Sequence, residues 1–135
     1  MPDKVTFAKT FLTLERAIDI AHQRNSYITS NISNVDTPNY KPKEIDFEQA
    51  LSQALQPQRG FALVRTNSRH IDQGIHEPGG VEPFEDEGEW NGFNWVDLDK
   101  EMTRLIENNL RYRAATETLL RKIAVLKEVI KEGGR

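Results

Sequence analysis

The sequence predicts a mainly α-helical protein in which two long terminal helices pack as an antiparallel coiled-coil hairpin. Apolar residues recur at alternating steps of three and four near both ends of the chain, which is the heptad pattern of a coiled coil. The interval between these ends is rich in Pro and Gly and shows no such period. We expect one structural unit, with an N-terminal assembly helix over 1–35, a middle segment over 36–96 and a C-terminal assembly helix over 97–135.

The N-terminal helix is predicted by a stripe that holds for about four heptads. Asn25 is its only polar member, and the stripe continues to Val35. A helix of roughly 30–35 residues would be about 45–50 Å long, which suits a coiled coil better than a compact globule. The predicted interface residues of this stripe are Phe7, Phe11, Leu14, Ile18, Ala21, Asn25, Ile28 and Ile32.

The C-terminal helix carries a second stripe of the same kind, with Asn109 and Thr116 as polar members. A polar residue in an apolar stripe can fix the register of two helices. Two interpretations are open: Asn25 and Asn109 meet across an intrachain contact, or each amide points to solvent. The predicted interface residues are Leu98, Met102, Leu105, Asn109, Tyr112, Leu119, Ile123, Leu126 and Ile130.

Local signals mark where the helices begin and end. Asp97 is an N-cap candidate for the C-terminal helix, and Lys131 and Gly133 lie where that helix should stop. In the middle segment, 45–55 is predicted as a short helix with Asp46 as its N-cap. Ile45 is placed to pack against Ala50, and "FALVRT", residues 61–66, has the composition of a short strand. The rest of the middle segment is expected to be loops.

No combination of residues points to catalysis. The chain has no cysteine, a net charge of −3 and no clustered basic face, which argues against thiol chemistry and nucleic-acid binding. His22, His70 and His76 lack metal-ligand spacing, and the acidic run over 82–89 lies in a Gly- and Pro-rich loop. Rigid, differently shielded carboxylates would be needed for acid–base work. We therefore expect no enzyme activity, catalytic residue, cofactor or metal.

Two further features bear on location and contacts. The N-terminus has no apolar core of a cleavable signal peptide, and no window approaches the roughly 18 apolar residues of a membrane span. Trp90, Phe93 and Trp95 crowd the segment before the C-terminal helix. They are expected either to pack at the base of that helix or to form an exposed contact patch.

The stretch "NISNVDTPNY", residues 31–40, closes the N-terminal helix. Thr37-Pro38 cannot continue the helix, and Asn39 tolerates the positive φ of a left-handed turn. The residues predicted to form this turn are Asn31, Asn34, Asp36, Thr37, Pro38, Asn39 and Tyr40.

"SNISNVDTPNYKPKEIDFEQAL" resembles the N-terminal signature of flagellar axial proteins, the rod, hook and hook-associated subunits. In that family a long helix ends in N-[IL]-[AS]-N and is followed by a Thr-x-Gly-Tyr-like turn, often with Gly where this chain has Asn39. "RTNSRHI" and the block from "VDLDKEMTRL" to the end are similar to proximal rod proteins in particular. The family's Gly-Asn-x-Val motif is present in modified form at Gly92, Asn94 and Val96. The resemblance covers nearly the whole chain.

The resemblance implies a structural subunit of the proximal rod of the bacterial flagellar basal body, which carries motor torque, surrounds the export channel and serves motility. Implied partners are copies of itself, other rod subunits, the membrane-embedded ring and the export gate, without nucleic acid or membrane insertion. It also implies type III export without a cleaved signal. The turn residues would then fix a corner or meet a neighbouring subunit. The alternative from the heptads alone is a soluble coiled-coil adaptor or chaperone, which has no evident need of the "NISNVDTPNY" turn.

Overall fold

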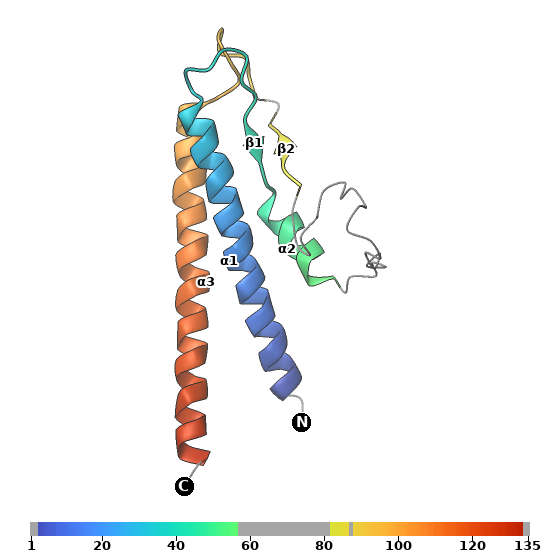
Figure 1. Ribbon diagram of the computed structural model, residues 1–135, viewed down its shortest axis with the longest axis vertical. Helices are drawn as coiled ribbons and strands as arrows, with labels where there is room; N and C mark the ends of the chain where they lie inside the picture. Colours follow the sequence, from blue (N-terminus) through green and yellow to red (C-terminus); the bar gives the residue numbers. More distant parts are fainter. Residues whose placement is uncertain (1–2, 57–81, 87, 134–135) are drawn as a thin grey trace, which may run out of the picture.

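Two long antiparallel helices form the body of the molecule. The computed structural model describes residues 3–56, 82–86 and 88–133. Within them α1 spans Asp3–Ser33 and α3 spans Leu98–Gly133, and the two helices pack together with both chain ends at the same end of the molecule (Figure 1). The predicted fold class, two long terminal helices with a short helix between them, is confirmed.

A small antiparallel sheet lies beside α1, next to its upper part in the view of Figure 1. β1 (Lys43–Glu44) pairs with β2 (Phe84–Glu85), with Lys43 opposite Glu85. The strand expected over 61–66 lies outside the described residues. Each observed strand has only two residues, too few to show the alternation by which a strand is recognised in a sequence.

The buried core lies between α1 and α2 (Phe47–Leu55). Ile20, Ile45 and Ala50 form its centre, and they are at most 2% exposed. Tyr27 and Phe47 pack against this cluster. α1 therefore uses two faces, one toward α3 and one toward α2, and it carries most of the buried apolar residues in the described part of the chain, namely Ala17, Ile20, Ala21 and Ile28.

Both N-caps predicted from the sequence are present, one at the start of α2 and one at the start of α3. Asp46 accepts a hydrogen bond of 2.9 Å from the Gln49 backbone N–H and caps α2. Asp97 accepts one of 3.1 Å from the Lys100 N–H and caps α3. Ile45 and Ala50 both lie in the buried cluster, as expected for residues that staple a helix start.

Burial along the two predicted stripes differs between the long helices. The described stripe members on α1 are all buried or half-buried. On α3, Leu105, Leu119 and Ile123 are half-buried, whereas the buried residues are Glu101 and Asn108. The exposed members of the predicted stripe are Leu98, Met102, Asn109, Tyr112, Leu126 and Ile130.

α3 is thus rotated so that a polar edge faces α1. Glu101 and Asn108 precede Met102 and Asn109 by one residue each and keep the same seven-residue spacing. This rotation is possible because Glu101 and the Nδ2 group of Asn108 each find a hydrogen-bond partner on α1, as described below. Among the described helices, none is long and apolar enough to span a membrane.

Candidate functional site

The chain turns the corner after α1 with one residue in the left-handed region. Asn39 has φ of 58°, which confirms the left-handed turn expected at this position. Its N–H donates to Phe93 O over 3.0 Å, and Trp95 N–H donates to Tyr40 O over 3.1 Å. These backbone bonds hold the segment after α1 beside the segment before α3.

Asn94 joins these two segments through its side chain. It is fully buried, and its Nδ2 donates to the carbonyls of Val35 at 2.6 Å and Thr37 at 3.1 Å. Its Oδ1 accepts the N–H of Val96 at 2.9 Å. Asn94 and Val96 belong to the modified Gly-Asn-x-Val motif, so that motif closes the corner by capping the irregular backbone at the end of α1.

Asn31 holds β1 against the end of α1. Its Oδ1 accepts the Lys43 N–H at 3.0 Å, and its Nδ2 donates to Lys43 O at 2.8 Å, as a neighbouring strand would. The same Nδ2 donates to Glu101 at 3.0 Å, and the Tyr40 hydroxyl donates to Oδ1 at 3.2 Å. All the hydrogen-bonding capacity of a buried amide is used, and α1, β1 and α3 meet at this one side chain.

The other predicted turn residues act locally or lie at the surface. Asn34 donates to Ser30 O over 2.8 Å and accepts the Thr37 hydroxyl over 3.0 Å. Asp36 and Pro38 have exposed side chains. The structure therefore divides the motif into an inward part, centred on Asn31 and Tyr40, and an exposed outward part.

A network of charged residues continues from Asn31. Three of its members are buried, two are half-buried and Lys100 is exposed. We call it the corner network: Arg24, Glu44, Asp86, Lys100, Glu101 and Arg104. Glu44 Oε1 lies 2.7 Å from Arg24 Nε, and Glu44 Oε2 lies 2.7 Å from Arg104 Nε. The other Arg104 nitrogens contact Glu101 at 2.6 Å and Asp86 at 2.8 Å. Three carboxylates and three cations alternate, so the network is neutral while linking α1, β1, the end of β2 and α3.

The network holds its central groups in their charged forms. Burial would raise the pKa of the Asp86 carboxyl, but hydrogen bonds from Lys100 and Arg104 outweigh it and lower that pKa below its ordinary value. For Arg104, burial would lower the pKa, yet the surrounding carboxylates raise it above its usual range. Each charged group of the corner network has an oppositely charged partner. The network therefore holds the elements together and contains no free acid or base.

Asn108 connects the middle of the two long helices. It is 1% exposed, and its Nδ2 donates to Ala21 O on α1 over 2.8 Å. Asn109 is exposed, and Asn25 is half-buried. The buried amide of α3 is therefore Asn108, which directly precedes the predicted stripe residue Asn109 in the sequence. Its hydrogen-bond partner is a backbone carbonyl of α1.

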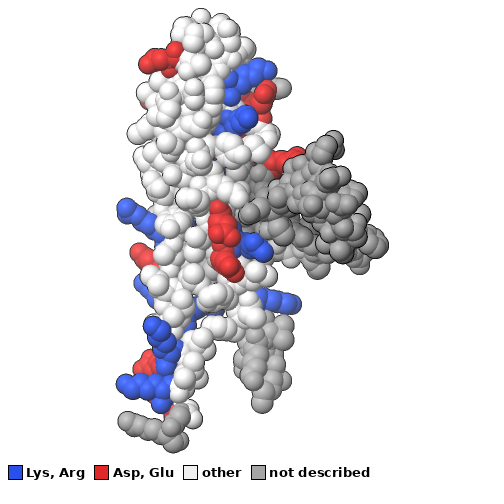
Figure 2. Space-filling model, in the orientation of Figure 1, with Lys and Arg blue, Asp and Glu red and all other residues white. Residues whose placement is uncertain are grey.

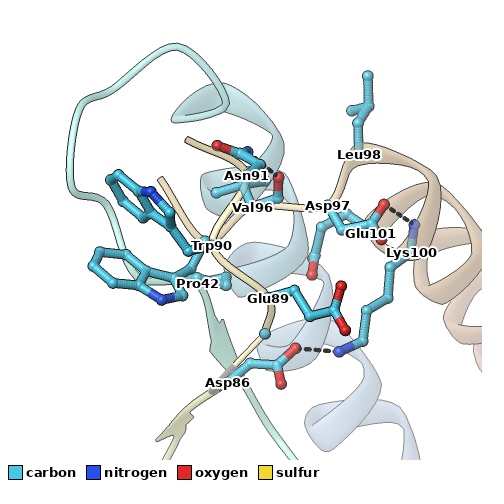
Figure 3. Close-up of a pocket in the computed structure, with 12 residues that line it drawn as sticks. Pro42, Asp86, Glu89, Trp90, Asn91, Val96, Asp97, Leu98, Lys100 and Glu101 are labelled. Carbon is cyan, nitrogen blue, oxygen red and sulfur yellow. Dashed lines mark hydrogen bonds and ion pairs between the residues drawn. The ribbon is translucent and has the colours of Figure 1, made fainter. Parts of the chain in front are cut away.

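A pocket of about 590 Å³ opens beside the corner, and we call it the tip pocket. It is lined by Pro42 and by residues between Asp86 and Glu101, including Trp90 and Trp95 (Figure 3). The two indole rings pack with centroids 4.5 Å apart. Trp95 is half-buried, whereas Trp90 and Phe93 are 48% and 47% exposed. The aromatic cluster therefore contributes both to packing and to the surface.

Among the described residues, no group of three His, Asp or Glu side chains could hold a metal ion. His22 is exposed on α1, and His70 and His76 lie outside the described residues. The described part of the acidic run supplies Asp86 to the corner network and Glu89 to the tip pocket.

Comparison with known proteins identifies the family. A flagellar basal body rod protein FlgB of Bacillus subtilis (strain 168) is 36% identical over 129 residues, which cover 94% of this chain and 97% of that protein. The chain belongs to the FlgB family of flagellar basal body rod proteins.

Other relatives agree with this membership. The FlgB of Aeromonas hydrophila is 33% identical, with 94% of this chain and 96% of the relative covered. The FlgB of Escherichia coli (strain K12) is 31% identical, with 98% of this chain and 99% of the relative covered. No family model matches the chain. The resemblance drawn from the turn motif and the C-terminal block is confirmed, and the corner network and Asn94 lie within the matched chain.

Proposed function

We propose that this chain is a structural subunit of the proximal rod, which assembles with copies of itself and with other rod proteins into the shaft that transmits motor torque and surrounds the export channel. In this role the corner network fixes the angle between the helical body and the side segment. It is a scaffold and performs no chemistry. The support is a family membership over nearly the full chain length together with large unpartnered apolar surfaces.

The observation that carries the proposal is an exposed apolar row on α3. Leu98, Met102, Ile106 and Leu110 follow one another at four-residue steps and are 45–69% exposed. Residues four apart are neighbours on a helix surface, so the row is continuous. Exposed apolar stretches of this length are typical of protein–protein contacts. Figure 2 also shows a wide area without charged side chains over the upper part of the two long helices.

The second half of α3 exposes further aliphatic residues. Leu120, Val125, Val129 and Ile130 are 59–66% exposed. In Figure 1, α3 extends past the start of α1 at this end. Subunits stacked in a helical array bury such faces through contacts that repeat without closing, which suits a shaft better than a closed dimer.

Family membership also supports our proposal for the location and the remaining partners. A rod subunit lies in the basal body of the cell envelope, and it would contact the membrane-embedded ring and the export gate at its base. We propose export by the flagellar type III route without a cleaved signal. The exposed row alone would also suit a cytosolic coiled-coil adaptor, but the relatives' names favour the rod.

Deletion of the gene followed by electron microscopy of isolated basal bodies tests the proposal. We expect basal bodies without a complete rod, and restoration by the wild-type gene. The variant Ile106→Asp/Leu110→Asp should be produced at a normal level yet fail to restore rods, because it places charge in the apolar row. Thr118→Asp, at an exposed polar position of the same helix, is the matched control and should restore them. Complete rods in the deletion strain would overturn the proposed function.

A further inference from the structure

The side chain of Asn91 holds the loop that precedes α3. Its Oδ1 accepts the backbone N–H groups of Phe93 and Asn94, each over 2.9 Å. Its Nδ2 donates to Asn94 Oδ1 over 2.9 Å and to Val96 O over 3.1 Å, and Figure 3 shows the amide turned toward Val96. These four bonds use the full hydrogen-bonding capacity of an amide, although Asn91 is exposed to solvent.

The residue after Asn91 gives this pair a chemistry of its own. The backbone nitrogen that follows an Asn can attack the side-chain carbon Cγ. Gly favours this attack because it has no Cβ and reaches the widest range of φ and ψ. Gly92 has a φ of 95°, and no atom lies within 4 Å of the place of an added Cβ. The backbone conformation, and not a lack of space, therefore calls for Gly at a position where it also makes Asn91 reactive.

The reaction is a deamidation in two steps. The Gly92 nitrogen forms a bond to Asn91 Cγ, the Cγ–Nδ2 bond breaks, and ammonia leaves with the proton of the Gly92 N–H. Water then adds to one of the two carbonyl carbons of the resulting succinimide ring, and the ring nitrogen takes up a proton as its bond to that carbon breaks. The products are an aspartate at position 91 or an isoaspartate, in which the backbone runs through Cγ.

The folded loop opposes the first step. The leaving group Nδ2 is held by Asn94 Oδ1 and Val96 O, and the Asn91 backbone N–H donates to Asn94 O over 3.0 Å. Attack on Cγ turns the planar amide into a tetrahedral centre and moves Oδ1 and Nδ2 away from these partners. Local opening of a loop breaks such bonds together and occurs in a small fraction of the molecules. The reaction is therefore confined to molecules in which this loop is open.

We propose that Asn91-Gly92 is a deamidation site that the closed loop protects, so that modification records the time a chain spends with this loop open. The modified chain does not close the loop as before. An aspartate at position 91 sets carboxylate oxygens against Asn94 Oδ1 and Val96 O, to which Nδ2 donates in the folded loop, and two acceptors form no hydrogen bond with each other. Because Asn94 closes the corner at the end of α1, the disturbance reaches that corner.

Peptide mass mapping tests the site. The purified full chain is incubated at mildly alkaline pH, once in native buffer and once in guanidinium chloride, and the acid formed at position 91 is measured over time. We expect its formation to be at least about tenfold faster in denaturant, because opening of the loop limits the reaction only in the folded chain. Gly92→Ala should slow the reaction in denaturant, where the fold plays no part.

Asn34 is the internal control in the same samples. The β-branched Val35 that follows it hinders the attack, so Asn34 should remain an amide in both solutions. Equal rates at position 91 in the two solutions, or no acid at this position in denaturant, would overturn the proposal.

Loosening the loop of the folded chain gives a second readout. Asn94→Ala removes one partner of Asn91 Nδ2 and should raise the rate at position 91 in native buffer severalfold. Glu85→Gln, which changes an exposed ion pair, is the matched control and should leave that rate unchanged. Circular dichroism checks that both variants remain helical. An unchanged rate in Asn94→Ala would contradict the protective role of the loop.

Substitution by the product residue tests the consequence for the fold. Asn91→Asp should melt at least about 3 °C below the wild type. Asn109→Asp, the same change at an exposed position of α3, should melt close to the wild type. Equal melting of Asn91→Asp and wild type would show that the deamidated loop closes normally. None of these outcomes bears on the proposed function, since they concern one loop of the purified chain.

Discussion

Arg104 Nε on α3 lies 2.7 Å from Glu44 Oε2 on β1, and the same carboxylate lies 2.7 Å from Arg24 Nε on α1. The Glu44 side chain is 6% exposed, so one buried carboxylate holds three elements that are far apart in the sequence. A molecule with little apolar core thus uses a charged centre to fix its shape. A buried ion pair of this kind adds little stability when compared with apolar packing. Removal of one partner is nevertheless costly, because it leaves the other charge buried and uncompensated.

Removal of the Glu44 charge should therefore be costly. Glu44→Gln leaves Arg24 and Arg104 buried without their shared carboxylate, and we expect the free energy of unfolding to fall by about 3–5 kcal/mol. Urea denaturation followed by far-ultraviolet circular dichroism measures this loss. Glu85→Gln is the control, because its pair with Lys41 spans 3.3 Å and both side chains are more than half exposed. It should cost less than about 1 kcal/mol, and equal losses for the two variants would contradict the role of the corner network.

Asn31 should matter more than Asn34, although the sequence motif presents them alike. Asn31→Ala removes four hydrogen bonds, those with Lys43, Tyr40 and Glu101, and leaves buried groups unsatisfied. We expect a loss of about 3 kcal/mol for Asn31→Ala, against about 1 kcal/mol for Asn34→Ala, whose partners are local. The same denaturation measurement compares them, and a larger loss for Asn34→Ala would show that the inward part of the motif has been assigned to the wrong residue.

Much of the fold could be predicted because its signals are local. The periodicity of the long helices, the caps at Asp46 and Asp97 and the left-handed turn at Asn39 each depend on a few adjacent residues. The resemblance to rod proteins likewise rests on contiguous stretches, and the relatives confirm it.

The corner network could not be predicted from the same signals. Glu44 and Arg104 are 60 positions apart in the sequence, and only the tertiary fold brings them together. Glu101 and Asn108 are not predicted by apolar periodicity, because that pattern takes no account of polar residues. Their seven-residue spacing nevertheless indicates a shared helix face. A buried polar stripe is visible in a sequence only when charged and amide residues are tested for heptad spacing as well.

The turn at Asn39 gives a prediction about backbone conformation. At a φ of 58° a residue with an ordinary side chain costs roughly 1–2 kcal/mol, while Gly and Asn adopt this region more easily. Asn39→Ala should therefore lower the free energy of unfolding by about 1 kcal/mol, and Asn39→Gly should change it little. Thermal denaturation of the two variants checks the difference. A destabilisation of the same size in both would indicate that the Asn39 side chain, and not its backbone conformation, is what the turn requires.

The pH dependence of stability should reveal Asp86. Hydrogen bonds from Lys100 and Arg104 lower the pKa of this carboxyl in the folded state despite its burial. The unfolded chain therefore binds the proton more tightly, so the stability that Asp86 contributes is present above its unfolded pKa of about 3.9 and is lost as the pH falls through the lower folded pKa. Asp86→Asn removes this contribution. The difference in the free energy of unfolding between wild type and Asp86→Asn should stay constant above about pH 5 and narrow below about pH 4. Urea denaturation at several pH values measures it, and a difference that does not narrow in acid would mean that the pairing of Asp86 with Lys100 and Arg104 does not stabilise the fold.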